Sequence, residues 1–172
     1  MLKKTYIILS NFFHSLKIKE FLEIMVSPFI FTVIIYVLCN TSINDFSKFA
    51  DDFTNMVISI TSILGAFSLA TLSIIITSSN SNIDYAKKEF TERKDRLKKN
   101  ITYYKLQVLR NFFSLFLLFG LLLYSIAFKF LQSVVSNIDI LFYIELYMLM
   151  VAVISQIFII QSMYFLFVEP KK

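Results

Sequence analysis

Two polar side chains interrupt the last long apolar block of the chain. Glu145 and Gln156 are eleven residues apart, about three helical turns, so in a helix they point to the same side. A carboxyl group at membrane depth is costly and usually faces the interior of a helix bundle or a water-filled path. Glu145 also lies close to Asp139, at the edge of the block. Two interpretations stay open: an ion-path or sensing role, or interfacial exposure with pairing to Lys129.

The apolar block at 55–78 carries small and hydroxyl side chains at helical spacing. Small residues let neighbouring helices approach closely, and hydroxyl groups bond to their own helix or to a neighbour. The pattern predicts either helix packing or, in an oligomer, the lining of a polar path. At about 100° per residue the side chains concerned share one narrow helical face: Ser59, Ser62, Ala66, Ala70, Ser73 and Thr77.

The basic connection at 79–111 carries a second candidate surface. Apolar residues recur there at spacings of three, four or seven, which predicts a helix with a heptad-like stripe that Arg93 interrupts. One interpretation is a contact surface for a soluble partner, and the other is a solvated helix on the anionic membrane surface. The residues predicted to bind a partner are Phe90, Arg93, Lys94, Leu97, Lys98 and Lys99.

Residue types that are typical of enzyme sites are scarce. The chain has one cysteine, Cys39, and one histidine, His14, so a single chain cannot assemble a zinc site of the usual Cys and His type. Both glycines, Gly65 and Gly120, lie inside apolar blocks, which excludes a glycine-rich phosphate loop. We therefore expect no enzyme activity, no cofactor and no metal.

Four long apolar blocks must position these residues. They lie near 21–39, 55–78, 112–133 and 139–168, and each can cross a hydrocarbon layer about 30 Å thick, which takes about 20 helical residues. With 57% hydrophobic residues and a mean hydropathy of +0.69, a chain of 172 residues is difficult to keep soluble as a globule. The blocks therefore predict four transmembrane helices.

Lys and Arg gather on one side of these blocks. They lie in the N-terminal segment, in the 79–111 connection and at Lys171 and Lys172, whereas Lys48 and Lys129 remain for the other side. Because segments rich in these residues stay in the cytoplasm, we expect a multi-pass protein of the bacterial cytoplasmic (inner) membrane with both termini inside. The net charge of +5 then reflects topology, and direct nucleic-acid binding is not expected.

The first 20 residues predict an interfacial helix rather than a cleaved signal peptide. The apolar run at 6–9 is short, and lysines return at 17 and 19. An amphipathic helix along the membrane surface is one interpretation, and a tail without fixed structure is the other. The apolar residues at helical spacing are Leu2, Tyr6, Leu9, Phe13 and Leu16.

Together these observations predict an all-α membrane protein of one domain, residues 1–172. Its core is a four-transmembrane-helix bundle, preceded by the interfacial helix at 1–20. A cytoplasmic helical extension at 79–111 joins the second and third transmembrane helices.

This layout resembles the four-span membrane subunits of bacterial anti-phage defence systems, in particular the KwaA family of the Kiwa system. The resemblance covers the whole chain as a hydropathy pattern, and the segment ITSILGAFSLATLSIIITSS at 60–79 is similar to spans of such proteins. It implies an oligomeric membrane component that senses envelope disturbance by a phage and acts through a cytosolic partner.

We therefore expect a non-enzymatic sensor or effector subunit with three kinds of partner. These are the lipid bilayer, further copies of the chain in a homo-oligomer such as a tetramer, and a cytosolic protein. Two alternatives belong to other classes. One is a small pore-forming or ion-conducting (holin-like) protein that uses the hydroxyl face and Glu145, and the other is a bacteriocin immunity protein.

Overall fold

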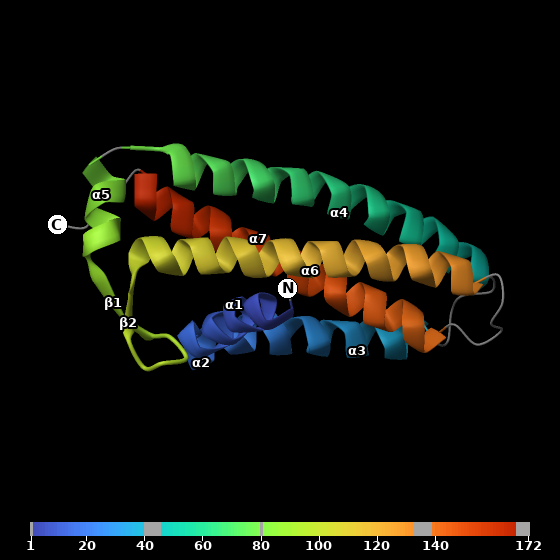
Figure 1. Ribbon diagram of the computed structural model, residues 1–172. Coiled ribbons are helices and arrows are strands. Elements are labelled where there is room, and N and C mark those ends of the chain that lie inside the picture. Colours follow the sequence, from blue (N-terminus) through green and yellow to red (C-terminus); the bar gives the residue numbers. More distant parts are fainter. Residues whose placement is uncertain (1, 40–45, 80, 133–138, 168–172) are drawn as a thin grey trace.

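The computed structural model describes residues 2–39, 46–79, 81–132 and 139–167 (Figure 1). Within them, four helical stretches are long and apolar enough to cross a membrane: Ile18–Leu38, Lys48–Thr77, Tyr103–Gln132 and Asp139–Tyr164. The predicted helical bundle with four membrane-length helices is therefore confirmed. The elements are α1 (Leu2–Ser15), α2 (Ile18–Phe21), the π-helical turn η1 (Leu22–Val26), α3 (Ser27–Cys39), α4 (Phe46–Thr77), α5 (Ser81–Lys88), β1 (Phe90–Lys94), β2 (Asn100–Thr102), α6 (Tyr103–Gln132) and α7 (Asp139–Phe167).

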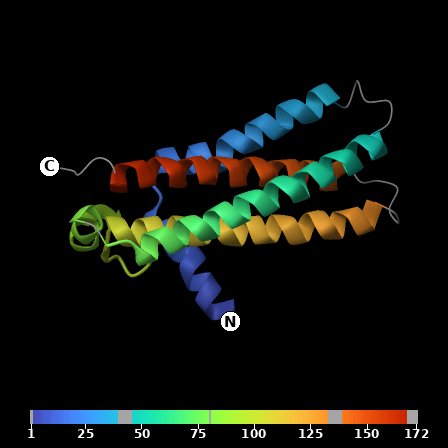
Figure 2. The same cartoon turned by 90° about the horizontal axis from the view of Figure 1, so that it is seen from above.

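The long helices run side by side, and α7 contacts the other three. It packs against α3, α4 and α6, while α4 lies along α6. Part of the core between them is aromatic, with Phe128 and Phe142 both fully buried, and the next layer is aliphatic, around Val57, Leu118 and Leu121. Figure 2 shows that α1 leaves this bundle obliquely instead of running along it.

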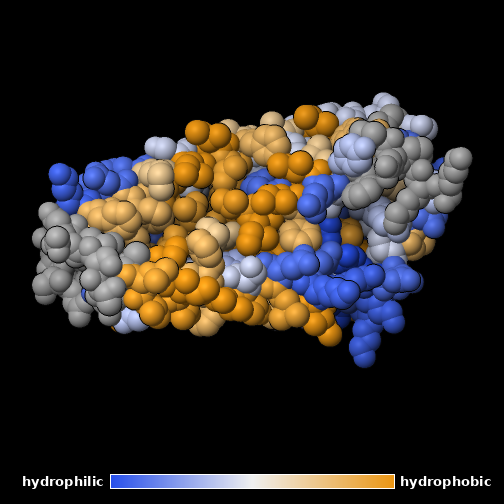
Figure 3. Space-filling model, turned by 180° about the vertical axis from the view of Figure 1, so that it is seen from behind, coloured by the Kyte–Doolittle hydropathy of each residue, from blue (hydrophilic) through white to orange (hydrophobic). Residues whose placement is uncertain are grey.

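The outer surface of the bundle is apolar over most of its length. Figure 3 shows this surface, with hydrophilic residues gathered at the end that carries the β1–β2 hairpin. We call this end the basic end; α2, α5 and the start of α6 also lie there (Figure 1). Large apolar side chains of α3, such as Phe29, Ile30 and Val37, are exposed. Such exposure suits a surface that faces lipid, because lipid tails solvate these side chains as well as a protein core does.

The first membrane-length helix contains a π-helical turn just before Pro28. Proline has no N–H, so the carbonyl group of Ile24 loses its ordinary helical partner. One turn of wider winding precedes this position, where the N–H of Ser27 donates to the carbonyl oxygen of Leu22. The hydroxyl group of Thr32 donates to the carbonyl oxygen of Pro28 at 2.9 Å. The helix therefore continues through the proline, from Ile18 to Leu38.

The prediction of one helical extension over 79–111 is wrong. Helix α5 ends at Lys88, and β1 and β2 then pair as an antiparallel hairpin before α6 begins at Tyr103. Helices α4 and α6 are also longer than the predicted spans, because α4 begins at Phe46 and α6 at Tyr103. The segment thus holds a short helix and a hairpin that stand on the end of the bundle.

Local chemistry explains why the hairpin forms. Thr91 and Ile101 are β-branched residues that suit strands, and the hydroxyl group of Thr91 donates to the carbonyl oxygen of Ile101 at 2.7 Å. At the turn, Asp95 accepts hydrogen bonds from the N–H groups of Leu97 and Lys99 at 2.9 and 3.0 Å. Lys98 has a φ of 60°, the left-handed residue that often follows a type I turn in a hairpin. The heptad-like spacing is thus cut by a turn.

Helix α1 packs on the bundle through a different side from the predicted one. Phe12 is 2% exposed and stacks on Phe113 of α6 with ring centroids 3.8 Å apart, whereas Phe13 is 45% exposed. Leu9 and Leu16 also pack on this cluster, as predicted for the apolar side. The predicted turn at 134–138 and the C-terminal lysines lie outside the described residues.

Candidate functional site

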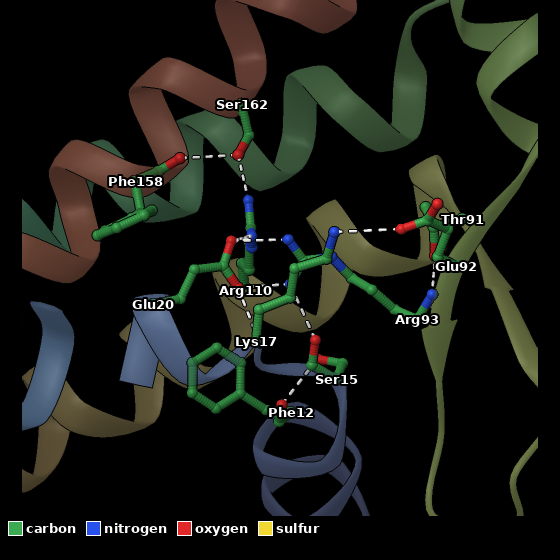
Figure 4. A network of polar contacts seen from close by, with 10 residues as sticks. All are labelled: Phe12, Ser15, Lys17, Glu20, Thr91, Glu92, Arg93, Arg110, Phe158 and Ser162. Carbon is green, nitrogen blue, oxygen red and sulfur yellow. Dashed lines mark hydrogen bonds and ion pairs between the residues drawn. The ribbon is translucent and has the colours of Figure 1, made fainter. Parts of the chain in front are cut away.

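A carboxylate from the first membrane-length helix joins elements from four parts of the chain at the basic end. Glu20 of α2 accepts hydrogen bonds from Arg93 of β1 and Arg110 of α6 (Figure 4). Arg110 also donates to the hydroxyl group of Ser162 on α7. Glu20, Arg93, Arg110 and Ser162 are called the Glu20 cluster below. Its contacts connect the N-terminal helices, the hairpin and two membrane-length helices.

Arg93 is the residue that attaches the hairpin to the bundle. Both terminal nitrogens of its guanidinium group donate to the Glu20 carboxylate, and the Nη2–Oε1 distance is 2.7 Å. Nη1 also donates to the carbonyl oxygen of Ser15, at the end of α1, at 2.9 Å. The fork of N–H groups on arginine matches the two oxygens of a carboxylate, which makes such pairs both strong and directional.

Water has little access to this ion pair. The side chains of Glu20, Arg93 and Arg110 are 15%, 14% and 12% exposed. The neighbouring pair of Lys17 and Glu92 is different, since those side chains are 59% and 88% exposed at an Nζ–Oε2 distance of 3.3 Å. Breaking a poorly hydrated pair leaves an uncompensated charge, whereas an exposed pair contributes little. The Glu20 cluster is therefore the ion pair at this end that can control conformation.

A second set of contacts ties α1 to the hairpin directly. The N–H of Arg96 donates to the side-chain oxygen of Asn11 at 3.2 Å, and the Arg96 guanidinium group lies 6.0 Å from the centre of the Tyr6 ring. Together with the bond from Arg93 to Ser15, these contacts run along the side of α1 that faces the hairpin. A displacement of α1 must therefore disturb the hairpin.

The Glu20 cluster borders a cavity of about 620 Å³. Its walls come from α2, α5, β1, α6 and α7, so the cavity lies where the hairpin meets the bundle. Aromatic and amide side chains surround the charged groups. Besides the Glu20 cluster, the residues lining it that matter below are Asn82, Tyr85, Phe90, Tyr103, Phe158 and Gln161.

The tip of the hairpin holds a second carboxylate, with its own network. The Lys105 ammonium group lies 3.2 Å from Asp95 Oδ2, in addition to the two backbone N–H groups that stabilise the turn. Burial raises the pKa of Asp95, but these hydrogen bonds and the lysine charge lower it further, so its pKa lies below the ordinary value. The Asp95 carboxylate therefore stabilises the turn in its charged form.

The structure separates the predicted partner-binding residues into two groups. Arg93 turns inward to Glu20 and Ser15. The others keep exposed side chains on one hairpin, which is a more compact surface than a helix of the same length: Phe90, Lys94, Leu97, Lys98 and Lys99.

The two predicted intramembrane polar residues both lie inside the bundle. Glu145 is fully buried, and the hydroxyl group of Thr54 on α4 donates to its Oε2 at 2.9 Å. The predicted pairing with Lys129 is wrong, because Lys129 lies 3.5 Å from Asp51 instead. The interpretation of interfacial exposure is wrong as well. The reason is that Glu145 points along the inner face of α7 rather than toward the surface.

Gln156 lies on the same inner face and connects three helices. Its amide nitrogen donates to the hydroxyl groups of Ser68 on α4 and Ser114 on α6, the latter at 2.7 Å. Hydrogen bonds of this kind hold helices together where no water is present. Glu145 and Gln156 thus serve the packing of α7 within one chain.

The predicted small-residue face of α4 points away from the bundle. Ser59, Ser62 and Thr77 donate their hydroxyl groups to carbonyl oxygens of their own helix. Helix α4 packs inside the chain through other small and polar residues, including Thr61 and Ser68. All six residues of the predicted face are exposed in the single chain: Ser59, Ser62, Ala66, Ala70, Ser73 and Thr77.

Sequence reasoning missed Glu20, Arg110 and Ser162. Arg110 had a visible signal, since it directly precedes the apolar block at 112–133 and would be costly there without a partner. Glu20 gave no comparable signal among the charged residues near it. Its partners, Arg93 and Arg110, are 73 and 90 residues away in sequence.

Comparison of the chain with protein-family models, with curated proteins and with solved structures finds no match.

Proposed function

We propose that the chain is a non-enzymatic membrane sensor or effector subunit that forms an oligomer and acts through a cytosolic protein partner. The observation that carries this proposal is the Glu20 cluster. One poorly hydrated carboxylate is shared between the helix that follows α1, the hairpin and the membrane-length helices. A disturbance at the membrane surface can therefore reach the hairpin.

The sensing element in this proposal is α1. It leaves the bundle obliquely (Figure 2) and is anchored by the stacking of Phe12 on Phe113. A change in the lipid surface that shifts α1 pulls on Ser15 and Glu20, and so on Arg93. Because an unpaired buried charge is costly, the cluster favours two discrete arrangements, paired and separated, over a graded response.

The output surface in this proposal is the hairpin tip. It combines exposed lysines, among them Lys94, Lys98 and Lys99, with the exposed apolar side chain of Leu97. A positively charged surface with an apolar residue at its centre suits a partner with an acidic surface, since complementary charge steers association. The excess of Lys and Arg at this end places it in the cytoplasm. The anti-phage role is what the resemblance of the sequence implies.

The proposal is tested by isolating the full chain in mild detergent from its host and measuring the mass of the complex by native mass spectrometry. We expect a symmetric oligomer with a stoichiometric soluble protein. The triple variant Lys94→Gln, Lys98→Gln and Lys99→Gln should lose that protein and keep the oligomer. The matched control changes Lys3, Lys4 and Lys19 to Gln, which removes the same charge from exposed positions off the hairpin. Equal loss of the partner in both variants would contradict the proposal.

A pore is the second candidate, favoured by the outward direction of the small-residue face of α4. In an oligomer this face can line a path between copies of the chain. Replacing Ser62, Ser73 and Thr77 with Val should then abolish ion flux through liposomes that contain the protein. In the sensor proposal the same variant keeps the partner, and a partner-free oligomer with a flux sensitive to Ser62, Ser73 and Thr77 would favour the pore.

A further inference from the structure

The charges around Glu20 do not balance. Two guanidinium groups, of Arg93 and Arg110, surround one carboxylate, which leaves an excess of one positive charge. The other carboxylate that lines the cavity, Glu92, is 88% exposed and is paired with Lys17. An anion placed beside the two arginines would therefore meet a net positive field with little competition from water.

Hydrogen-bond donors are also in excess. Each guanidinium group has five N–H donors. Bonds to the described residues use three of them on Arg93 and two on Arg110. Phosphate oxygens are well matched to arginine, because one phosphate accepts from two guanidinium groups at once.

The cavity beside these arginines has room for a ligand. About 620 Å³ lies within the usual range of small-molecule sites, roughly 300–1,000 Å³. Tyr85, Tyr103 and Phe158 supply apolar and aromatic wall, and Asn82 and Gln161 supply amide groups. Figure 4 shows Arg93 and Arg110 converging on Glu20 from different elements, so an anion can reach both only at this point.

We propose that this cavity binds a phosphate group, which competes with Glu20 for Arg93 and Arg110. The phosphate belongs either to the headgroup of an anionic lipid or to a soluble phosphate compound. The site lies at the basic end, where the membrane-length helices end, so both sources can reach it. This inference names the ligand class of the site proposed above and in that respect rests on the proposed function. When phosphate takes the place of Glu20, the hairpin loses its attachment to α2.

The test uses the purified full chain and two probes. Inorganic phosphate is titrated at constant ionic strength in detergent, with thermal unfolding followed by circular dichroism. Separately, the protein is placed in nanodiscs of phosphatidylcholine with or without phosphatidylglycerol, and the retained lipid is identified by native mass spectrometry. Stabilisation by inorganic phosphate indicates a soluble source. Selective retention of phosphatidylglycerol without that stabilisation indicates a lipid headgroup.

Variants separate phosphate binding from a merely structural role of the cluster. Glu20→Gln removes the internal competitor and should bind the active probe about tenfold more tightly, although it weakens the fold. Arg110→Gln should abolish binding; if that variant does not fold, Arg110→Lys, which keeps the charge but not the fork, should weaken binding about tenfold. Lys94→Gln, an exposed position on the same hairpin, should bind like the wild type.

The inference is overturned if neither probe binds the folded wild type or Glu20→Gln, or if Glu20→Gln binds no better than the wild type. It is also overturned if Lys94→Gln loses as much binding as the Arg110 variants. Those results would leave the partner experiment with Lys94, Lys98 and Lys99 untouched, because that experiment measures the hairpin tip. Loss of the partner with intact phosphate binding would instead contradict the proposed function alone.

Discussion

Replacing Glu20 with Ala should cost far more stability than replacing its exposed neighbour Glu92. Three charge-assisted hydrogen bonds end on the Glu20 carboxylate, two from Arg93 and one from Arg110. Breaking a buried pair costs roughly 3–5 kcal/mol, because the remaining charges stay poorly hydrated. The three side chains keep 12–15% exposure, so we take the lower end, about 3 kcal/mol for Glu20→Ala.

The control is Glu92→Ala, in which the side chain lost is 88% exposed and paired only with Lys17 among the described residues. Exposed pairs contribute about 0–1 kcal/mol, so the two variants should differ by at least about 2 kcal/mol. The assay is equilibrium unfolding of the full chain in mixed micelles with rising sodium dodecyl sulfate, followed by circular dichroism. Equal costs for the two variants, within about 0.5 kcal/mol, would refute the claim that the Glu20 cluster is poorly hydrated and structurally important.

Three further predictions concern the hairpin and the bundle interior. Because the pKa of Asp95 is lowered in the folded chain, its contribution is present above the ordinary pKa and is lost as pH falls through the lowered value; hydrogen exchange at 95–99 should accelerate selectively near pH 3. Lys98→Gly should stabilise the hairpin by about 1 kcal/mol relative to Lys98→Ala, since φ is 60° there; slower exchange in Lys98→Ala would contradict this. Glu145→Gln, which keeps an acceptor for Thr54, should cost less than about 1 kcal/mol in micelle unfolding, whereas Glu145→Ala should cost about 2 kcal/mol or more; equal costs would argue against a packing role.

Hydropathy was enough to predict the four membrane-length helices, because each buries or exposes apolar residues over its whole length. It could not predict the hairpin. Residues such as Ile83 and Ile101 fit one heptad-like series, but the bonds that select strands join Thr91 to Ile101 and Asp95 to its own turn. These contacts depend on where the chain turns, and helical periodicity does not contain that information.

The candidate site was less accessible to sequence reasoning than the fold. Glu145 was correctly singled out as an unusual carboxylate, but its partner, Thr54, is 91 residues away. Helix α4 carries hydroxyl residues on two sides, and the sequence did not distinguish the inner set, which includes Thr54 and Ser68, from the outer set with Ser62. Hydroxyl groups that bond to their own helix can face lipid at little cost, so composition alone does not reveal which side is buried.

The most direct test of the account asks whether a disturbance of α1 reaches the hairpin. Phe12→Ala removes the stacking on Phe113, and Phe13→Ala is the matched control at an exposed position. Hydrogen exchange of the amides at 90–102 is measured for both variants in nanodiscs. The account predicts faster exchange in Phe12→Ala than in Phe13→Ala, with no further increase when Glu20→Gln is added to Phe12→Ala. Wild-type exchange at 90–102 in a folded Phe12→Ala variant would contradict the coupling of α1 to the hairpin.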